Sequence, residues 1–285
     1  MTESSFINAE AGVLYIVATP IGNLSDMTER AIETLRGVDL ILAEDTRHTK
    51  PLLQHFAINT RTQAFHDHNE RDQVSKVIEK LEAGKNIALV SDAGTPLISD
   101  PGYGLVNAAQ KANVQVSPIP GACAVIAALS ASGMPTDQFL FAGFIPAKTQ
   151  QRLNFLKSFT EQTSTLVFYE SSHRILDSLR DCVEVFGDRK ATMARELTKK
   201  FETIRSTTFD ELRQWVSEDE NQRKGEFVLI VEGVDKNQDK DDQNMDQMLC
   251  VLLEELSVSQ AVDLTVKLLG AKKNKVYKRA LELGK

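Results

Sequence analysis

The sequence predicts an α/β protein of two domains, followed by a small, basic helical module. Apolar, β-branched runs alternate with helix-like segments over the first 230 residues or so, which is typical of a parallel or mixed sheet covered on both faces. A chain of 285 residues is long enough to hold two cores. Residues 257–285 carry seven basic and two acidic side chains, whereas the whole chain has a net charge of −7.

In the first half of the chain, apolar runs that end in Gly, Pro or acidic residues predict strands, and capping residues before spaced apolar positions predict helices. Thr28, for example, precedes a helical pattern that contains Ala31, Ile32 and Leu35. The predicted strands are 13–18, 38–43, 87–90 and 114–116. The other predicted helices are 49–56, 70–81, 103–112 and 122–132.

The second half begins after Gly133 and Pro135, which stop the preceding helix. Its last strands are closely spaced, which favours antiparallel pairing. The predicted strands are 139–144, 165–169, 191–195, 202–206 and 227–231. The predicted helices are 148–158, 172–186 and 209–217. We therefore expect a first domain over 12–134 and a second over 135–234.

Residues 235–247 contain five Asp, two Lys and almost nothing apolar, which predicts an acidic, flexible linker. A basic helical module is expected over 248–285. Its helical patterns, which begin just before that boundary, cover 245–256, 259–269 and 274–283. A piece this short rarely folds alone, so we expect it to dock on the body or on a partner.

Several classes of protein are excluded by what the sequence lacks. No apolar run approaches the roughly 20 residues of a membrane span, and the N-terminal residues have neither the basic region nor the apolar core of a secretory signal. Cys123, Cys182 and Cys250 have no metal-site spacing, so we expect free thiols, no metal and a cytoplasmic location. The first strand is not followed by GxGxxG, and no P-loop occurs.

The loop at 91–102, Ser-Asp-Ala-Gly-Thr-Pro-Leu-Ile-Ser-Asp-Pro-Gly, is the strongest indication of a ligand site. It follows the apolar strand at 87–90, and Gly and Pro turns let backbone groups approach a ligand closely. Ligands of open α/β sheets bind at the carboxyl ends of strands. Asp92 and Asp100 are each readily explained as turn residues, but the two together favour a small-molecule site.

Two other polar segments leave alternatives open. Residues 44–47 (Glu-Asp-Thr-Arg) follow a predicted buried strand, so they either cap a helix or face a site. Residues 66–70 (His-Asp-His-Asn-Glu) lack a third metal ligand at diagnostic spacing, which favours a solvated loop or an RNA-facing edge. Glu170 follows an apolar run and is expected to point into a cleft.

Six motifs follow one another along the chain: 18–24 (Ala-Thr-Pro-Ile-Gly-Asn-Leu), 44–47, 66–70, 91–102, 120–122 (Pro-Gly-Ala) and 169–174 (Tyr-Glu-Ser-Ser-His-Arg). In this combination the chain resembles the tetrapyrrole methylase family, and most closely its branch of small-subunit ribosomal RNA cytidine 2′-O-methyltransferases. The resemblance covers nearly the whole chain. It implies a two-domain tetrapyrrole-methylase-like fold, with S-adenosylmethionine in the interdomain cleft, and a homodimer.

The resemblance also implies which residues contact the cofactor. The family's Gly-Gly-Asp-Pro loop matches 93–96, where Thr95 replaces the acidic residue, so its contact must differ. The expected cofactor contacts are Pro20, Asp92, Ala93, Gly94, Thr95, Ile98, Cys123, Ala124, Tyr169 and Leu197.

The implied reaction is 2′-O-methylation of a cytidine in small-subunit (16S) ribosomal RNA, with the RNA or the small ribosomal subunit as partner. It requires alignment of the ribose oxygen and a group that takes its proton. The candidate bases are Asp45, Asp100 and Glu170, among which the residues do not decide. The expected phosphate contacts, each of which also fits a surface ion pair, are Arg47, Arg174, Arg195, Lys199, Lys272, Lys273, Lys275, Lys278 and Arg279.

Two other functions stay open at this point. One is a tetrapyrrole C-methyltransferase, which shares the fold and cofactor but has no use for a basic module. The other is a non-catalytic helix-turn-helix regulator with a ligand-sensing body, which would transfer no methyl group.

Overall fold

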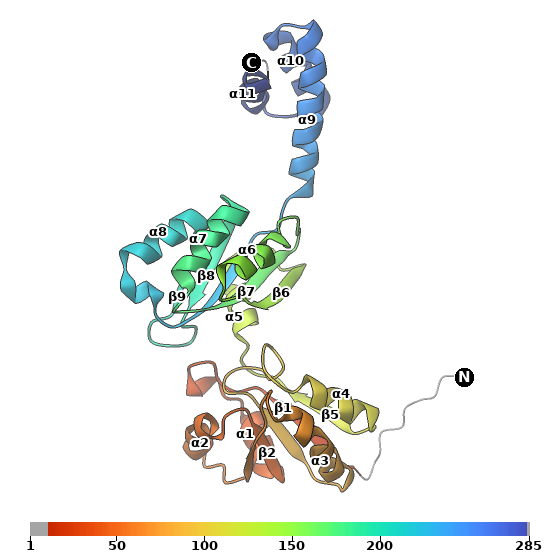
Figure 1. Cartoon of the computed structure of the whole chain (residues 1–285), viewed down its shortest axis with the longest axis vertical. Helices are drawn as coiled ribbons and strands as arrows, with labels where there is room; N and C mark the ends of the chain where they lie inside the picture. The colour runs from red at the N-terminus through yellow and green to blue at the C-terminus, as the bar shows by residue number, and fades with distance from the viewer. Residues whose placement is uncertain (1–10, 284–285) are drawn as a thin grey trace, which may run out of the picture. The chain divides into compact units, whose positions relative to one another are not determined.

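A computed structural model describes residues 11–283, apart from the side chains of 236–243. The chain divides into two compact units (Figure 1). The first consists of the residues up to Thr160 and of Ser164–Glu232, and it holds both sheets. The second consists of Glu161–Thr163 and Gly233–Lys285. Each predicted α/β domain therefore contributes one sheet to the same unit.

The first sheet has five parallel strands in the order β3-β2-β4-β1-β5. The strands are β1 (Val13–Val17), β2 (Leu40–Ala43), β3 (Thr62–Ala64), β4 (Ile87–Val90) and β5 (Gln115–Ile119). Every residue of β2 and β4 is buried, which explains why their sequences are uninterrupted apolar runs. The edge strand β3 was not predicted, because three residues of sequence Thr-Gln-Ala carry no strand pattern.

Two helices cover each face of the first sheet. The helices α1 (Glu29–Gly37) and α2 (Thr46–His55) share one apolar core with it, and α3 (Glu70–Glu82) and α4 (Tyr103–Lys111) share the other. The predicted cap of α1 is confirmed, since the Thr28 hydroxyl accepts a hydrogen bond from the Ala31 N–H. A short 3₁₀ helix, η1 (Leu24–Asp26), follows β1. Because the strands are parallel, the loops after β1, β2 and β4 meet at one edge of the sheet.

The second sheet has the order β6-β7-β10-β8-β9. Only β6 and β7 are parallel, and the later strands pair antiparallel as predicted. The strands are β6 (Phe139–Phe144), β7 (Thr165–Ser171), β8 (Lys190–Arg195), β9 (Thr203–Thr208) and β10 (Glu226–Val231). The helices are α5 (Ala124–Ser132), α6 (Thr149–Lys157), α7 (Ile175–Phe186), α8 (Phe209–Glu218) and the 3₁₀ helix η2 (Glu220–Arg223).

The helix α5 connects the two sheets. It belongs to the sequence of the first domain, but Val125, Ala128 and Leu129 pack against one face of the second sheet together with Ile21 from the loop after β1. The helices α6, α7 and α8 cover the opposite face. The predicted start of α7 at 172 is three residues early, because the Arg174 N–H bonds to the Ser171 carbonyl in a turn before the helix begins.

The C-terminal module consists of α9 (Lys236–Glu255), α10 (Val258–Leu269) and α11 (Lys273–Leu283). The prediction of a flexible linker over 235–247 is wrong for most of that segment, which belongs to α9. Met245 and Leu249 of α9 pack in the core of the module. Because this packing anchors the helix, each residue that extends it gains a backbone hydrogen bond at little further cost. Within the described residues, no helix combines the length and the apolar character that crossing a membrane requires.

Candidate functional site

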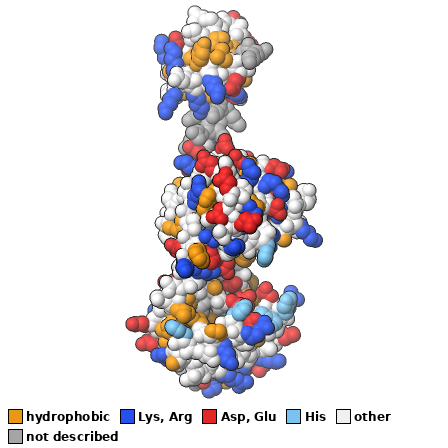
Figure 2. Space-filling model, turned by 90° about the vertical axis from the view of Figure 1, so that its left-hand side faces the viewer, with side chains coloured by type: hydrophobic (Ala, Val, Ile, Leu, Met, Phe, Trp, Pro, Cys, Tyr) orange, Lys and Arg blue, Asp and Glu red, His pale blue; other side chains and the backbone are white. Residues whose placement is uncertain are grey.

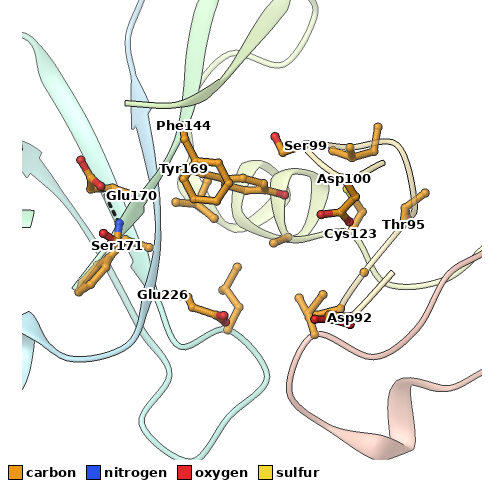
Figure 3. Close-up of a pocket in the computed structure, with 18 of the residues that line it drawn as sticks. Asp92, Thr95, Ser99, Asp100, Cys123, Phe144, Tyr169, Glu170, Ser171 and Glu226 are labelled. Atoms are coloured by element: carbon orange, nitrogen blue, oxygen red, sulfur yellow. Dashed lines mark hydrogen bonds between the residues drawn. The ribbon is translucent and has the colours of Figure 1, made fainter. Parts of the chain in front are cut away.

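A pocket of about 450 Å³ lies between the loops at the edge of the first sheet and the strands β7 and β10 of the second sheet; we call it the main pocket (Figure 3). Its walls come from the loops after β1, β2 and β4, the start of α5, and the ends of β6, β7, β8 and β10. Both walls belong to the first compact unit. The site is therefore enclosed by segments that are far apart in the sequence.

The main pocket collects most of the residues that the sequence predicted for a site. Those in its lining are Asp92, Ala93, Gly94, Thr95, Ile98, Asp100, Cys123, Ala124, Tyr169, Glu170 and Leu197. Of the predicted catalytic and cofactor-binding residues, two are not in it. Pro20 lines a neighbouring hollow instead, and Asp45 lines neither.

Hydrogen bonds hold the loop 91–102 against two other loops of the same wall. Thr19 and Gly94 exchange backbone hydrogen bonds of 2.8 and 3.0 Å. The Thr95 hydroxyl donates to the Ala122 carbonyl at 3.0 Å. Thr95, which replaces the acidic residue of the family pattern, thus joins this loop to the segment before α5. Bracing of this kind fixes the backbone groups that face a ligand before it arrives.

Acidic side chains dominate the first wall of the main pocket. Burial raises the pKa of Glu44, and the charge of Asp92 adds to that effect. Burial, together with the charges of Glu44, Asp92 and Asp67, raises the pKa of Asp100 to about 6, against a hydrogen bond from Ser91 that lowers it. These carboxylates repel one another, so the wall favours a positively charged ligand.

The second wall is largely apolar and aromatic. The Tyr169 ring packs edge-on to Phe141 at 4.9 Å and lies 5.2 Å from Phe144, between ring centroids. Burial raises the pKa of the Tyr169 hydroxyl, so it stays a neutral hydrogen-bonding group. Leu197 adds an aliphatic surface beside it. Figure 3 shows Tyr169 and Glu226 across from Asp92 and Asp100.

The candidate base Asp45 is committed to the start of α2. Its carboxylate caps the helix through the Arg47 N–H at 2.8 Å and binds the Arg47 guanidinium at 2.6 Å. These contacts hold the pKa of Asp45 far below its usual range. A carboxylate of such low basicity is a poor proton acceptor, and Glu44, not Asp45, is the residue of this segment that reaches the main pocket.

The candidate base Glu170 is fully engaged as well. Its buried carboxylate accepts from the Ser171 N–H at 2.7 Å, from Arg174 at 2.8 and 3.0 Å, and from the Ser178 hydroxyl. In Figure 3 the carboxylate points away from the pocket centre. Glu170 therefore fixes the turn before α7, and it occupies Arg174, a predicted phosphate contact that is only partly exposed.

A smaller hollow of about 270 Å³ adjoins the main pocket; we call it the side pocket. It lies between the loop after β1 and the first turns of α2, and Asp92 lines both pockets. The carboxylate of Asp92 accepts from the Asp45 N–H at 3.1 Å and binds Nδ1 of His48 at 3.0 Å. Sequence reasoning missed His48. A signal for it was available. His48 comes three residues after Asp45, in the first turn of a helix that follows a strand, so it lies at the edge of the sheet where ligands bind.

The predicted phosphate contacts differ in how accessible they are. Arg195 is buried, with 6% of its surface exposed, and donates to the carbonyls of Phe201, Asn221 and Lys224. Its prediction as an RNA contact is wrong, because these bonds use the guanidinium to hold loops of the second sheet together. Lys199 is half-buried and paired with Glu196 and Glu226. Arg47 is exposed beside the side pocket.

The cations of the C-terminal module lie on its surface. Lys272, Lys273, Lys275 and Lys278 are exposed, whereas Arg279 is half-buried and bound to Asp246 at 2.7 Å. Lys273 pairs with Asp263. Figure 2 shows Lys and Arg side chains around an apolar patch of this module. Among the described residues, no group of three or more His, Cys, Asp or Glu side chains is arranged to hold a metal ion.

Comparison with known proteins gives two family matches. The model described as "Tetrapyrrole (Corrin/Porphyrin) Methylases" matches residues 13–213, and the model described as "RsmI C-terminal HTH domain" matches residues 239–284. The chain is 54% identical over 272 residues to the ribosomal RNA small subunit methyltransferase I of Escherichia coli O157:H7, covering 95% of each chain. It is 49% identical to the protein of that name in Vibrio cholerae, covering 99% of each.

Solved structures share the fold at much lower identity. A diphthine synthase superposes with a TM-score of 0.61 at 15% identity, over 78% of this chain and 90% of that one. The uroporphyrin-III-C-methyltransferase of Thermus thermophilus superposes with a TM-score of 0.54 at 17% identity, over 78% and 94%. Identities this low establish the arrangement of the two sheets and nothing about the substrate.

Proposed function

Since the chain belongs to the tetrapyrrole methylase family, we propose that it is an S-adenosylmethionine-dependent methyltransferase acting on small-subunit ribosomal RNA, at the 2′-hydroxyl of a cytidine. The observation that carries the proposal is the charge of the main pocket. Its lining, within the described residues, includes five acidic residues and no Lys, Arg or His. Glu170 and Glu226 are paired with Arg174 and Lys199, so Glu44, Asp92 and Asp100 supply most of this charge. A pocket of that charge suits a cationic cofactor and disfavours a phosphate.

The residues of the main pocket fit S-adenosylmethionine, which carries a sulfonium and an ammonium group. Asp92 and Asp100, which line the pocket, would hold these positive charges. Ile98, Leu197 and the ring of Tyr169 supply apolar surface for the adenine, and the volume of about 450 Å³ falls within the range of small-ligand sites. When bound, the cofactor supplies an electrophilic methyl group, so the protein does not have to form a covalent intermediate.

The protein itself must position both reactants and accept the proton of the attacking hydroxyl. Backbone groups of 92–98 and 121–124 position the cofactor, and their bracing through Thr95 keeps them in place. Of the three candidate bases, only Asp100 combines a place in the pocket with a raised pKa. We assign its carboxylate to the positive charge of the cofactor.

The substrate assignment rests on the relatives, whose printed name is ribosomal RNA small subunit methyltransferase I. The module supports it, because exposed cations that neutralise phosphates provide sequence-independent affinity for RNA. The 2′-hydroxyl of a cytidine as the acceptor and a homodimeric state belong to the same proposal and follow from the resemblance of the motifs. A cytoplasmic location, expected from the cysteines, belongs to it as well.

A transfer assay tests the proposed function. The full-length chain is incubated with S-adenosylmethionine labelled in its methyl group and with small ribosomal subunits from a strain that lacks the enzyme. Label in the small-subunit RNA, and none in large subunits added as a control, is the expected result. Label in neither, with confirmed binding of the cofactor, would contradict the substrate; no binding of the cofactor would contradict the enzyme class.

A further inference from the structure

The side pocket is much less acidic than the main pocket, because among the described residues its lining holds one acidic side chain, Asp92, and one histidine, His48. The exposed His48 lines it, and the exposed Arg47 precedes His48 in α2. Its walls add the apolar surfaces of Pro20, Leu24, Pro51 and Leu52. A polyanionic ligand with a flat apolar part fits this combination, whereas the acidic lining of the main pocket repels such a ligand.

The size of the side pocket limits what it can take. A hollow of about 270 Å³ has room for one nucleoside and not for a tetrapyrrole macrocycle. At Gly22, which lines the side pocket, the aliphatic stem of Lys199 packs so closely that a β-carbon would come within 2.4 Å of its Cγ. The ammonium group of Lys199 is bound to Glu196 and Glu226 at 3.0 and 2.9 Å, which holds that stem in position.

The two pockets meet at one side chain, Asp92. Its carboxylate binds Nδ1 of His48 at 3.0 Å, and the Asp45 N–H donates to its other oxygen at 3.1 Å. Because a carboxylate can only accept, Nδ1 carries the proton of this hydrogen bond. The nitrogen that remains to accept a proton is Nε2, on a side chain that is 72% exposed.

We propose that the side pocket is the subsite for the target nucleotide, and that His48, positioned by Asp92, takes the proton of the attacking ribose hydroxyl. The inference rests on the proposed function. His48 Nε2 takes the proton as the ribose oxygen bonds to the methyl carbon, and the electron pair of the broken carbon–sulfur bond goes to sulfur. Arg47, which precedes His48 in α2 and is 87% exposed, binds a phosphate next to the nucleotide.

The surroundings of His48 support this role. The hydrogen bond and charge of Asp92 from the loop after β4, and the charge of Asp45 on its own helix, raise the pKa of His48, against Arg47, which lowers it. A base whose pKa lies slightly above its ordinary value is well matched to proton transfer near neutral pH. Asp92 is in this account a positioning residue for His48 as well as a wall of the main pocket.

Substitutions on α2 test the proposal. His48→Gln is compared with His55→Gln, an exposed histidine at the far end of the same helix that lines neither pocket. With saturating cofactor and small subunits, His48→Gln should lower the single-turnover rate by about 10²-fold or more, and it should remove the fall in rate at low pH. The Kd for S-adenosylmethionine, measured by calorimetry, should change less than twofold, and His55→Gln should match the wild type.

A footprint on the wild-type protein provides a readout that does not depend on activity. Diethylpyrocarbonate modifies accessible histidines, and mass spectrometry locates the product. Small ribosomal subunits should protect His48 and leave His55 reactive, whereas the cofactor alone should protect neither.

Three results would overturn the proposal while the wild type remains active. They are an unchanged rate and pH profile in His48→Gln, loss of cofactor binding in that variant, or equal modification of His48 with and without subunits. An inactive wild type would instead count against the proposed function, so the two failures are distinguishable.

Discussion

At the scale of the residue, the candidate site depends on how each carboxylate is partnered. Asp45 and Glu170 lie close to the pocket in sequence, yet hydrogen bonds to Arg47 and Arg174 give both of them structural roles. Asp100 has only a hydrogen bond from Ser91 against burial and three neighbouring acids. The carboxylate that stabilises the fold least is therefore the one best placed to bind a cation.

Asp100→Asn should weaken cofactor binding and stabilise the empty protein. The pKa of Asp100 is raised to about 6, so its charge is present above that pH and lost as the pH falls through it. In the wild type, cofactor affinity should therefore increase as the pH is raised through about 6. At pH 7.5 the variant should bind the cofactor about tenfold more weakly than the wild type, and its affinity should not show this pH dependence. Calorimetric titrations between pH 5 and 8 measure this.

The stability of the same variant should change in the opposite direction. A carboxyl whose folded pKa is raised destabilises the folded state once it ionises, so the wild type loses stability as the pH rises through about 6. At pH 7.5 Asp100→Asn should raise the free energy of unfolding by up to about 1 kcal/mol, after allowing for solvent screening. A melting temperature for the variant below that of the wild type at pH 7.5 would contradict this, because it would show that the ionised Asp100 carboxylate does not destabilise the folded protein.

Residues differ in how far the sequence could predict their role. The loop 91–102 was found because its Gly, Pro and Asp residues are adjacent in the chain, and local composition determines turns. His48 was missed because its partner Asp92 is 44 residues away. Arg195 was misassigned because an arginine at the end of a strand has the same local sequence whether it faces RNA or three carbonyls.

At the scale of the element, a buried ion pair joins α6 to α7. Arg152, 2% exposed, binds Asp181 at 2.6 Å and donates to the Ala147 carbonyl at 3.0 Å. Arg213, on the surface of α8, binds Asp210 at 2.7 Å with about half of each side chain exposed. Two pairs on neighbouring elements thus differ chiefly in burial.

Arg152→Ala should lower the free energy of unfolding by about 3–5 kcal/mol, because it leaves the Asp181 charge buried without its partner. The matched variant Arg213→Ala should cost less than about 1 kcal/mol, since solvent screens an exposed pair. Urea denaturation of both variants measures the difference. Equal losses would mean that burial does not determine the strength of these pairs.

Elements were predicted best where one pattern dominated. The buried strands β2 and β4 were found from their apolar runs, and α1 from its cap and spacing. Edge strand β3 escaped because its pairing with β2, and not its own sequence, makes it a strand. The extent of α9 escaped because its stability comes from packing in the module core, which composition does not show.

At the scale of the whole molecule, charge is divided among parts with different ligands. The main pocket is acidic, the side pocket has one histidine and one acidic residue in its lining, and the module exposes several lysines. The uneven charge along the chain predicted the basic module. The charge pattern could not predict the acidic pocket, because its carboxylates are spread along the chain between residues 44 and 226 and come together only when it folds.

Reversing three charges of the module should weaken RNA binding without affecting the cofactor. Lys272→Glu, Lys275→Glu and Lys278→Glu are combined in the full chain, because the main pocket lies entirely in the other unit. Affinity for small subunits should fall, and its logarithmic dependence on salt should flatten by about two units. An unchanged salt dependence would show that the module does not contact phosphates.

The central claim is that this acidic pocket places a methyl group on a ribose oxygen of small-subunit RNA. Mass spectrometry of nucleosides tests it most directly, after methylation of small subunits with deuterium-labelled S-adenosylmethionine and complete digestion. The account predicts labelled 2′-O-methylcytidine, absent with His48→Gln and present with His55→Gln. Label on a base carbon or base nitrogen, with none on ribose, would contradict it.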